Sequence, residues 1–163
     1  MTTTLERSVD VGAPASTAYN AWTQFELFPH FMQHVQMVRQ TGDRHLEWRA
    51  KILGHTEAWD AEITEQIPGK RIAWRSRGGA SNSGVVTFHR LSDDRSRVML
   101  QIAFEPEGWR EKLVTWLGLL GGRIEDDLED FRHFVEKYGH RFDGWRGEIR
   151  AKPDSAEPMR ASA

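Results

Sequence analysis

Between about Val35 and Phe104 the sequence alternates apolar and polar residues in at least five short segments. A period of two is typical of strands that bury one face, and the Gly, Pro, Asn and Asp residues between the segments favour turns. The pattern predicts consecutive antiparallel hairpins that form a sheet with one solvated face. The apolar positions are Leu46, Trp48, Ala50 and Ile52; Trp59, Ala61 and Ile63; Ile72 and Trp74; Val86 and Phe88; and Val98, Leu100, Ile102 and Phe104.

The Pro-Gly pair at 68–69 sets the register of one hairpin. Proline and glycine suit the two corners of a type II turn, whose second corner needs a positive φ. A turn at this point pairs Ile63 near Trp74 and Ala61 near Ser76. All four side chains then share one face of the sheet.

From about Trp109 the apolar period changes from two to about 3.6, which predicts one long amphipathic helix ending near Tyr138. Glycines interrupt this segment at positions 118, 121 and 122. They are consistent with a kink or close helix packing, and alternatively with space left for a ligand. The apolar stripe consists of Leu113, Trp116, Leu117, Leu120, Ile124, Leu128, Phe131, Val135 and Tyr138.

Before the hairpins, residues 5–11 alternate like a strand, and Pro14 suits the first turn of a helix that follows it. Pro29 interrupts the next apolar stretch, so a second, short helix is expected there. We therefore predict a single domain over residues 1–140. Residues 141–163 are small, polar and proline-bearing, and we expect a flexible C-terminal tail.

Composition excludes several classes of protein. The chain has 163 residues, enough for one domain with its own core, and no cysteine, which excludes disulfides and thiolate metal sites. The 22 basic and 24 acidic residues are mixed along the chain, so no footprint for nucleic acid is evident. No signal peptide or membrane-spanning run is recognisable, and we expect a cytoplasmic protein without a transmembrane segment.

The order of these elements resembles the START-like (SRPBCC) superfamily, an α+β helix-grip fold. The residues that carry the resemblance are VDVGAPASTAYNAWTQFELFPHFMQHVQMV, GHTEAWDAEITEQIPGKRIAWRSRGGASNSGVVTFHRL and FEPEGW, within about residues 4 to 138. Within the superfamily the chain is most similar to the polyketide cyclase/dehydrase and coenzyme Q-binding-like group. The resemblance implies a curved antiparallel sheet wrapped around the long C-terminal helix, with two short helices after the first strand.

The resemblance also implies an elongated cavity for a hydrophobic ligand between sheet and helix. The apolar side chains would then line a cavity, whereas in the alternative interpretation they simply fill a dense core. The residues expected to line the cavity are Trp48, Trp59, Trp74, Ser76, Asn82, Phe88, Leu100, Phe28, Phe31, Met32, Leu117 and Leu120.

Glu57 is the candidate catalytic residue. It lies two residues before Trp59 on the same predicted strand, so its side chain should point toward the same apolar side. A desolvated carboxyl there favours its acid form and would act as a general acid or base in enolisation and dehydration of a poly-ketone. The alternative is a carboxylate in water at the rim. Asn82 follows a glycine-rich loop and would donate hydrogen bonds to ligand carbonyls, unless it serves only the turn.

His30 and His34 have the i, i+4 spacing of two metal ligands on a helix. A third ligand is not evident and Pro29 breaks the helix at that point, so we expect neither a metal nor another cofactor.

Three functions agree with the sequence. The first is binding of a polyketide, quinone or lipid-like molecule. The second is an aromatase/cyclase that closes and dehydrates a poly-β-ketone, so whether the chain is an enzyme stays open. In the third, Phe28, Phe31 and Met32 form a patch for peripheral membrane or protein contact. The oligomeric state is not determined by the sequence.

Overall fold

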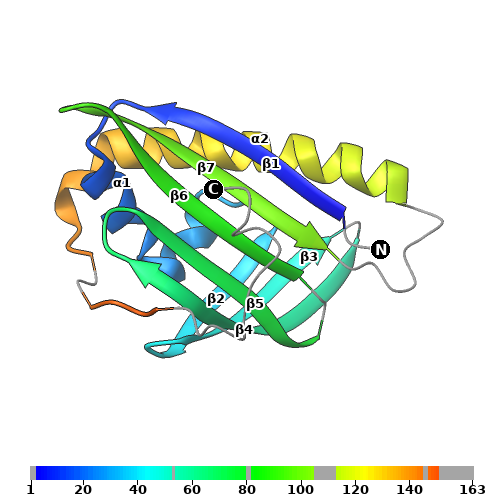
Figure 1. The fold of residues 1–163 in the computed structure, drawn as a ribbon. Helices are drawn as coiled ribbons and strands as arrows, with labels where there is room; N and C mark the ends of the chain where they lie inside the picture. Colours follow the sequence, from blue (N-terminus) through cyan, green and yellow to red (C-terminus); the bar gives the residue numbers. More distant parts are fainter. Residues whose placement is uncertain (1–2, 53, 80–81, 105–112, 145–146, 151–163) are drawn as a thin grey trace.

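The computed structural model describes residues 3–52, 54–79, 82–104, 113–144 and 147–150 (Figure 1). A strand and two short helices open the chain, six strands follow in succession, and a long helix comes near the end. The elements are β1 (Thr3–Val11), α1 (Ala15–Trp22), η1 (Phe25–His30), β2 (Val35–Gly42), β3 (His45–Ile52), β4 (His55–Ile67), β5 (Arg71–Gly79), β6 (Asn82–Ser92), β7 (Arg95–Phe104), α2 (Leu113–Tyr138) and η3 (Gly139–Arg141).

The strands of the described part form one seven-stranded sheet in the order β1-β7-β6-β5-β4-β3-β2, with every neighbouring pair antiparallel. The sheet is strongly curved, and α2 crosses its concave side alongside β1 (Figure 1). The helices α1 and η1 cover the end of the groove near the last turns of α2. The predicted α+β helix-grip fold is thus confirmed.

The β4–β5 hairpin has the predicted register. Ala61 pairs with Ser76 and Ile63 with Trp74. The Lys70 amide donates to the Ile67 carbonyl at 3.0 Å across the Pro-Gly corner. The glycine of that corner has a φ of +73°, the conformation that a type II turn requires at its second corner.

A β-bulge in β4 changes the alternation beyond this point. The register shifts between Ile63 and Glu65, after which Glu65 pairs with Ala73 and Gln66 with Ile72. A bulge inserts one extra residue and so exchanges the faces of the residues that follow. Gln66 consequently lies on the concave side with Ile72, and Glu65 lies on the convex side.

The core fills the end of the groove covered by α1 and η1. Trp22 of α1 packs edge-on against Phe28 and Phe131, with ring centroids 5.3 and 5.0 Å apart. Phe31 lies 5.3 Å from Phe131, so aromatic rings join both short helices to α2. Edge-to-face pairs add stabilisation beyond the area they bury. This end of the domain is therefore densely packed.

The long helix begins at Leu113 in the described part, and residues 105–112, including the expected start at Trp109, lie outside it. Leu117 and Leu120 lie within α2, but their side chains also lie outside the described part. The helix ends at Tyr138, as the sequence predicts.

After η3 the chain returns to the sheet at Ile149. The Gln66 amide donates to the Ile149 carbonyl at 2.8 Å, and the Ile149 amide donates back to Gln66 at 2.9 Å. The Ile149 side chain is buried in the core. Residues 151–163, most of the predicted tail, lie outside the described part.

Candidate functional site

An aromatic surface lies on the concave side of the sheet. Trp48 of β3 and Trp59 of β4 are directly opposite each other in the ladder, and their indoles stack with centroids 5.7 Å apart and planes 6° apart. The Phe28 ring lies 5.6 Å from Trp48 on the side toward η1. The two indoles thus form an apolar stack that packs against the core.

Trp74 of β5 lies on the same side of the sheet as this pair, and we name Trp48, Trp59 and Trp74 together the tryptophan face. Gly84 pairs with Trp74 across β5 and β6. A Cβ atom at Gly84 would lie only 2.2 Å from the Trp74 ring, so the indole lies flat over the backbone of β6. Glycine is needed at this position because of that close approach.

Burial differs sharply along the concave face. Ile63 and Ile72 are fully buried. Trp74, directly opposite Ile63 in the ladder, and the Trp48–Trp59 pair are only partly buried, although all three indoles contact the core. These large aromatic side chains lie on the side of the sheet that faces α2, yet they keep accessible area. The groove is therefore least filled by the described residues beside them.

The Trp48 indole N–H is buried and has no hydrogen-bond partner among the described residues. An unsatisfied buried donor costs about 1–3 kcal/mol. A ligand acceptor at this position would remove that cost.

Polar groups lie on the same face of β4 and β5. Glu57 is partly buried opposite Ala50, with the parity that the sequence predicts, and no hydrogen bond or ion pair to it is seen within the described ranges. The Ser76 hydroxyl accepts a 3.0 Å hydrogen bond from the backbone N–H of Asn82. This bond holds Asn82 at the start of β6, next to the tryptophan face.

Five other residues expected to line a cavity are buried in the core. Because Phe28, Phe31 and Met32 are covered, they do not form the exposed contact patch of the third functional interpretation. The five are Phe28, Phe31, Met32, Phe88 and Leu100.

Arg7 is a polar residue of this face that the sequence analysis missed. It lies on β1 between Leu5 and Val9, so its parity directs it toward α2. Its Nε atom lies 2.9 Å from Glu125 Oε1 of α2. A charged residue at an apolar parity position was the signal available in the sequence.

His30 and His34, which have the i, i+4 spacing of metal ligands, lie in different surroundings. His30 is exposed, whereas His34 Nδ1 lies 3.3 Å from Asp127 Oδ2 of α2. Within the described ranges no group of three or more His, Cys, Asp or Glu residues is placed to hold a metal ion.

Burial controls the protonation of this carboxyl–imidazole pair. Burial raises the pKa of Asp127 to about 7, and the charges of Asp130 and Asp126 add to the rise. Burial also lowers the pKa of His34, and Arg123 lowers it further. Both shifts favour the neutral groups, so near neutral pH the contact is not a permanent ion pair.

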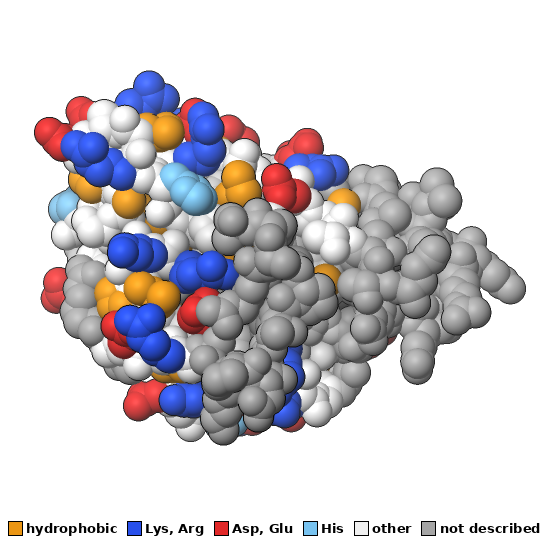
Figure 2. All heavy atoms as spheres, viewed as in Figure 1, with side chains coloured by type: hydrophobic (Ala, Val, Ile, Leu, Met, Phe, Trp, Pro, Cys, Tyr) orange, Lys and Arg blue, Asp and Glu red, His pale blue; other side chains and the backbone are white. Residues whose placement is uncertain are grey.

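The surface carries both signs of charge. Figure 2 shows basic and acidic side chains interspersed on the face turned toward the viewer.

Among the described helices, none is long and apolar enough to cross a membrane.

The gripped helix, the curved antiparallel sheet and the aromatic surface between them define a START-like protein. A family profile confirms this class: the chain belongs to the family described as "Polyketide cyclase / dehydrase and lipid transport", which matches residues 11–132.

The chain is also similar to individual known proteins. The chain is 47% identical over 146 residues to an uncharacterized 17.2 kDa protein of Streptomyces lincolnensis, covering 89% of this chain and 97% of that protein. A crystal structure from Deinococcus radiodurans is 30% identical with a TM-score of 0.64, covering 83% of this chain and 98% of that one. The Zhui aromatase/cyclase of a Streptomyces species has a TM-score of 0.71 at 16% identity, covering 85% and 96%, and this likeness shows the fold alone.

Proposed function

We propose that this protein binds a hydrophobic small molecule, of the polyketide, quinone or lipid-like class, between the sheet and α2. The observation that carries the proposal is the tryptophan face: three indoles that line the groove and remain partly exposed beside a fully buried core. Partly open aromatic surface with a few polar groups is the usual composition of a small-molecule site. Membership of a family named for polyketide chemistry and lipid transport supports the same class of ligand.

The side chains around the tryptophan face favour a ligand with flat, conjugated parts and carbonyl oxygens. The stacked indoles of Trp48 and Trp59 offer a planar apolar contact. The unpaired Trp48 N–H would donate to a ligand carbonyl, and the Ser76 hydroxyl, which accepts from Asn82, still has its own proton to donate.

Native mass spectrometry of freshly purified protein, followed by titration with an apolar fluorescent probe, tests this function. We expect a co-purified apolar molecule or saturable probe uptake, and weaker uptake by Trp59→Ala. Leu91→Ala is the matched control, because Leu91 is apolar but exposed on the surface. No uptake by the intact protein would overturn the proposal.

A second candidate, a cyclase activity, is favoured by the position of Glu57. Its carboxyl lies on the ligand side of β4, partly buried and without a partner in the described part of the chain. In aldol closure it would take a proton from the carbon that attacks a ketone and return it to the alkoxide oxygen that forms. In the dehydration it would take a second proton from the same carbon and return it to the hydroxyl, which leaves as water.

Turnover of a poly-β-ketone by the wild type and Glu57→Gln separates enzyme from carrier. If Glu57 moves these protons, the variant keeps probe affinity and loses cyclisation. Equal turnover by both proteins would exclude this role, while absence of turnover in the wild type would leave binding as the function.

A further inference from the structure

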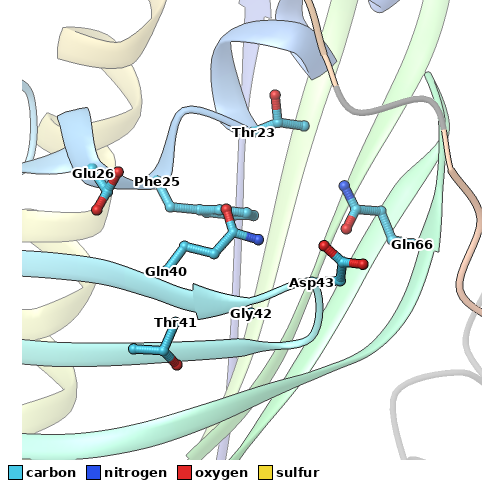
Figure 3. A pocket seen from close by; sticks show the side chains of 8 residues that line it. All are labelled: Thr23, Phe25, Glu26, Gln40, Thr41, Gly42, Asp43 and Gln66. Carbon is cyan, nitrogen blue, oxygen red and sulfur yellow. The ribbon is translucent and has the colours of Figure 1, made fainter.

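A pocket lies at the opposite end of β4 from Glu57, where the α1–η1 connection meets the β2–β3 turn (Figure 3). Its volume is about 450 Å³, enough for a small organic molecule. None of its residues belongs to the tryptophan face. The lining residues are Thr23, Phe25, Glu26, Gln40, Thr41, Gly42, Asp43 and Gln66.

Two β-bulges shape this pocket. One lies in β2 between Gln40 and Gly42, and the other lies in β4 between Ile63 and Glu65, just before Gln66. Bulges bend a strand and redirect its side chains, and they are frequent next to functional sites. Both strands that supply lining residues therefore depart from regular pairing at the pocket.

Gln66 is the buried polar group of the pocket, only 2% exposed. Its Nε2 donates to the Tyr19 hydroxyl at 3.0 Å, which fixes the side-chain amide. Figure 3 shows the Gln66 amide directed into the pocket, with its oxygen on the side of Asp43. An amide oxygen can accept two hydrogen bonds, so the Gln66 oxygen offers an acceptor at the inner end of the pocket.

Charge gives the pocket a preference for cations. Glu26 and Asp43 contribute carboxylates, and neither forms an ion pair within the described part of the chain. No lysine, arginine or histidine is among the lining residues. The ring of Phe25 forms an apolar wall between the polar groups (Figure 3). Carboxylates and an amide carbonyl accept hydrogen bonds, so the ligand must supply the donors.

We propose that this pocket binds a compact organic ammonium ion, whose N–H groups donate to Asp43, Glu26 and the Gln66 oxygen while its carbon chain lies against Phe25. The site is independent of the proposed hydrophobic-ligand function, because the two sites share no residue.

Amide NMR titration of the labelled full-length protein with putrescine tests the proposal, and butanediol is the uncharged control of equal chain length. Putrescine should shift the signals of residues 23–26 and 40–43 in a saturable way, and butanediol should not. Saturating the protein with an apolar probe should leave these shifts unchanged. Equal binding of both compounds, or putrescine shifts spread over the whole surface, would overturn the proposal.

Matched variants identify the pocket as the site. Asp43→Asn should weaken putrescine binding about threefold, and Asp43→Asn combined with Glu26→Gln about tenfold, as expected for charge pairs between exposed groups. Asp94→Asn removes an equally exposed carboxylate from the β6–β7 turn and should change nothing. An affinity in the double variant equal to that of the wild type would contradict the site.

Discussion

Trp48 and Trp59 face each other across β3 and β4, with their indole planes only 6° from parallel. Aromatic pairs favour either offset stacking, as here, or edge-to-face contact, as in the Trp22–Phe131 pair at 78°. The stacked pair is only partly buried, which distinguishes its part of the groove from the fully buried aromatic core around Phe131.

The first prediction compares the cost of losing a ring at the two ends. Replacing a fully buried aromatic residue with alanine typically lowers the free energy of unfolding by about 3–5 kcal/mol. Trp59→Ala should cost less than this, because Trp59 is only partly buried. Leu128→Ala, in the buried core, should cost about 2–5 kcal/mol although fewer atoms are removed. Urea denaturation of both variants gives the two values. A full core-scale loss for Trp59→Ala would show that this indole is packing.

The second prediction concerns the glycine under Trp74. Gly84→Ala should destabilise the protein by about 1–3 kcal/mol, because the new methyl group overlaps the indole. In a protein that already carries Trp74→Ala, the same Gly84→Ala substitution should cost much less, since the overlapping ring is gone. Gly78→Ala is the control, as a Cβ there meets no atom within 4 Å. Additive losses in the double variant would refute the close contact.

The third prediction is a pH dependence of stability due to Asp127. Its pKa is about 7 in the folded protein and near 4 in the unfolded chain, so the folded state binds more protons between these values. Its contribution is present at low pH and is lost as the pH rises toward 7, by up to about 4 kcal/mol. His34 has the opposite effect. Its pKa is lowered in the folded protein, so at acid pH the unfolded chain binds more protons there. This contribution makes the protein more stable as the pH rises toward the ordinary pKa of histidine.

Denaturation of the wild type and Asp127→Asn between pH 4 and 8 measures this contribution as their difference. The variant should lose the decline in stability with rising pH and gain relative to the wild type near neutrality. Asp94→Asn should run parallel to the wild type, since Asp94 is exposed. Parallel curves for Asp127→Asn as well would show that burial does not control this carboxyl.

The register of the β4–β5 hairpin could be predicted from the sequence because two local signals agree. Alternation identifies the shared face, and the Pro-Gly corner sets the pairing of Ala61 with Ser76. The bulge before Gln66 could not be predicted in this way. Continued alternation from Ile63 would place Gln66 on the solvated face, and an inserted residue leaves little trace in a polar–apolar pattern.

The polar contacts of α2 escaped sequence analysis for a different reason. The i, i+4 spacing of His30 and His34 is visible locally, whereas the partner of His34 is Asp127, far along the chain. Arg7 likewise meets Glu125 only after the fold brings β1 against α2. Composition and spacing predict which side chains lie on a face, but tertiary structure determines which of them meet.

The last prediction concerns the unpaired N–H of Trp48. Trp48→Phe and Trp59→Phe remove similar ring area from the same stack, but only Trp48 has a buried donor without a partner in the described part of the chain. Without ligand, Trp48→Phe should therefore be the less destabilising of the two by about 1 kcal/mol, because it also removes an unsatisfied donor.

With ligand the order should reverse. An aromatic ketone gains a hydrogen bond from the Trp48 N–H, whereas the matching hydrocarbon does not, so Trp48→Phe should weaken ketone binding about fivefold more than hydrocarbon binding. Trp59→Phe should weaken both ligands equally, because it removes only stacking area. Fluorescence titration of the two compounds against both variants measures these ratios. Equal ratios for the two variants would mean that the buried Trp48 donor plays no part in binding.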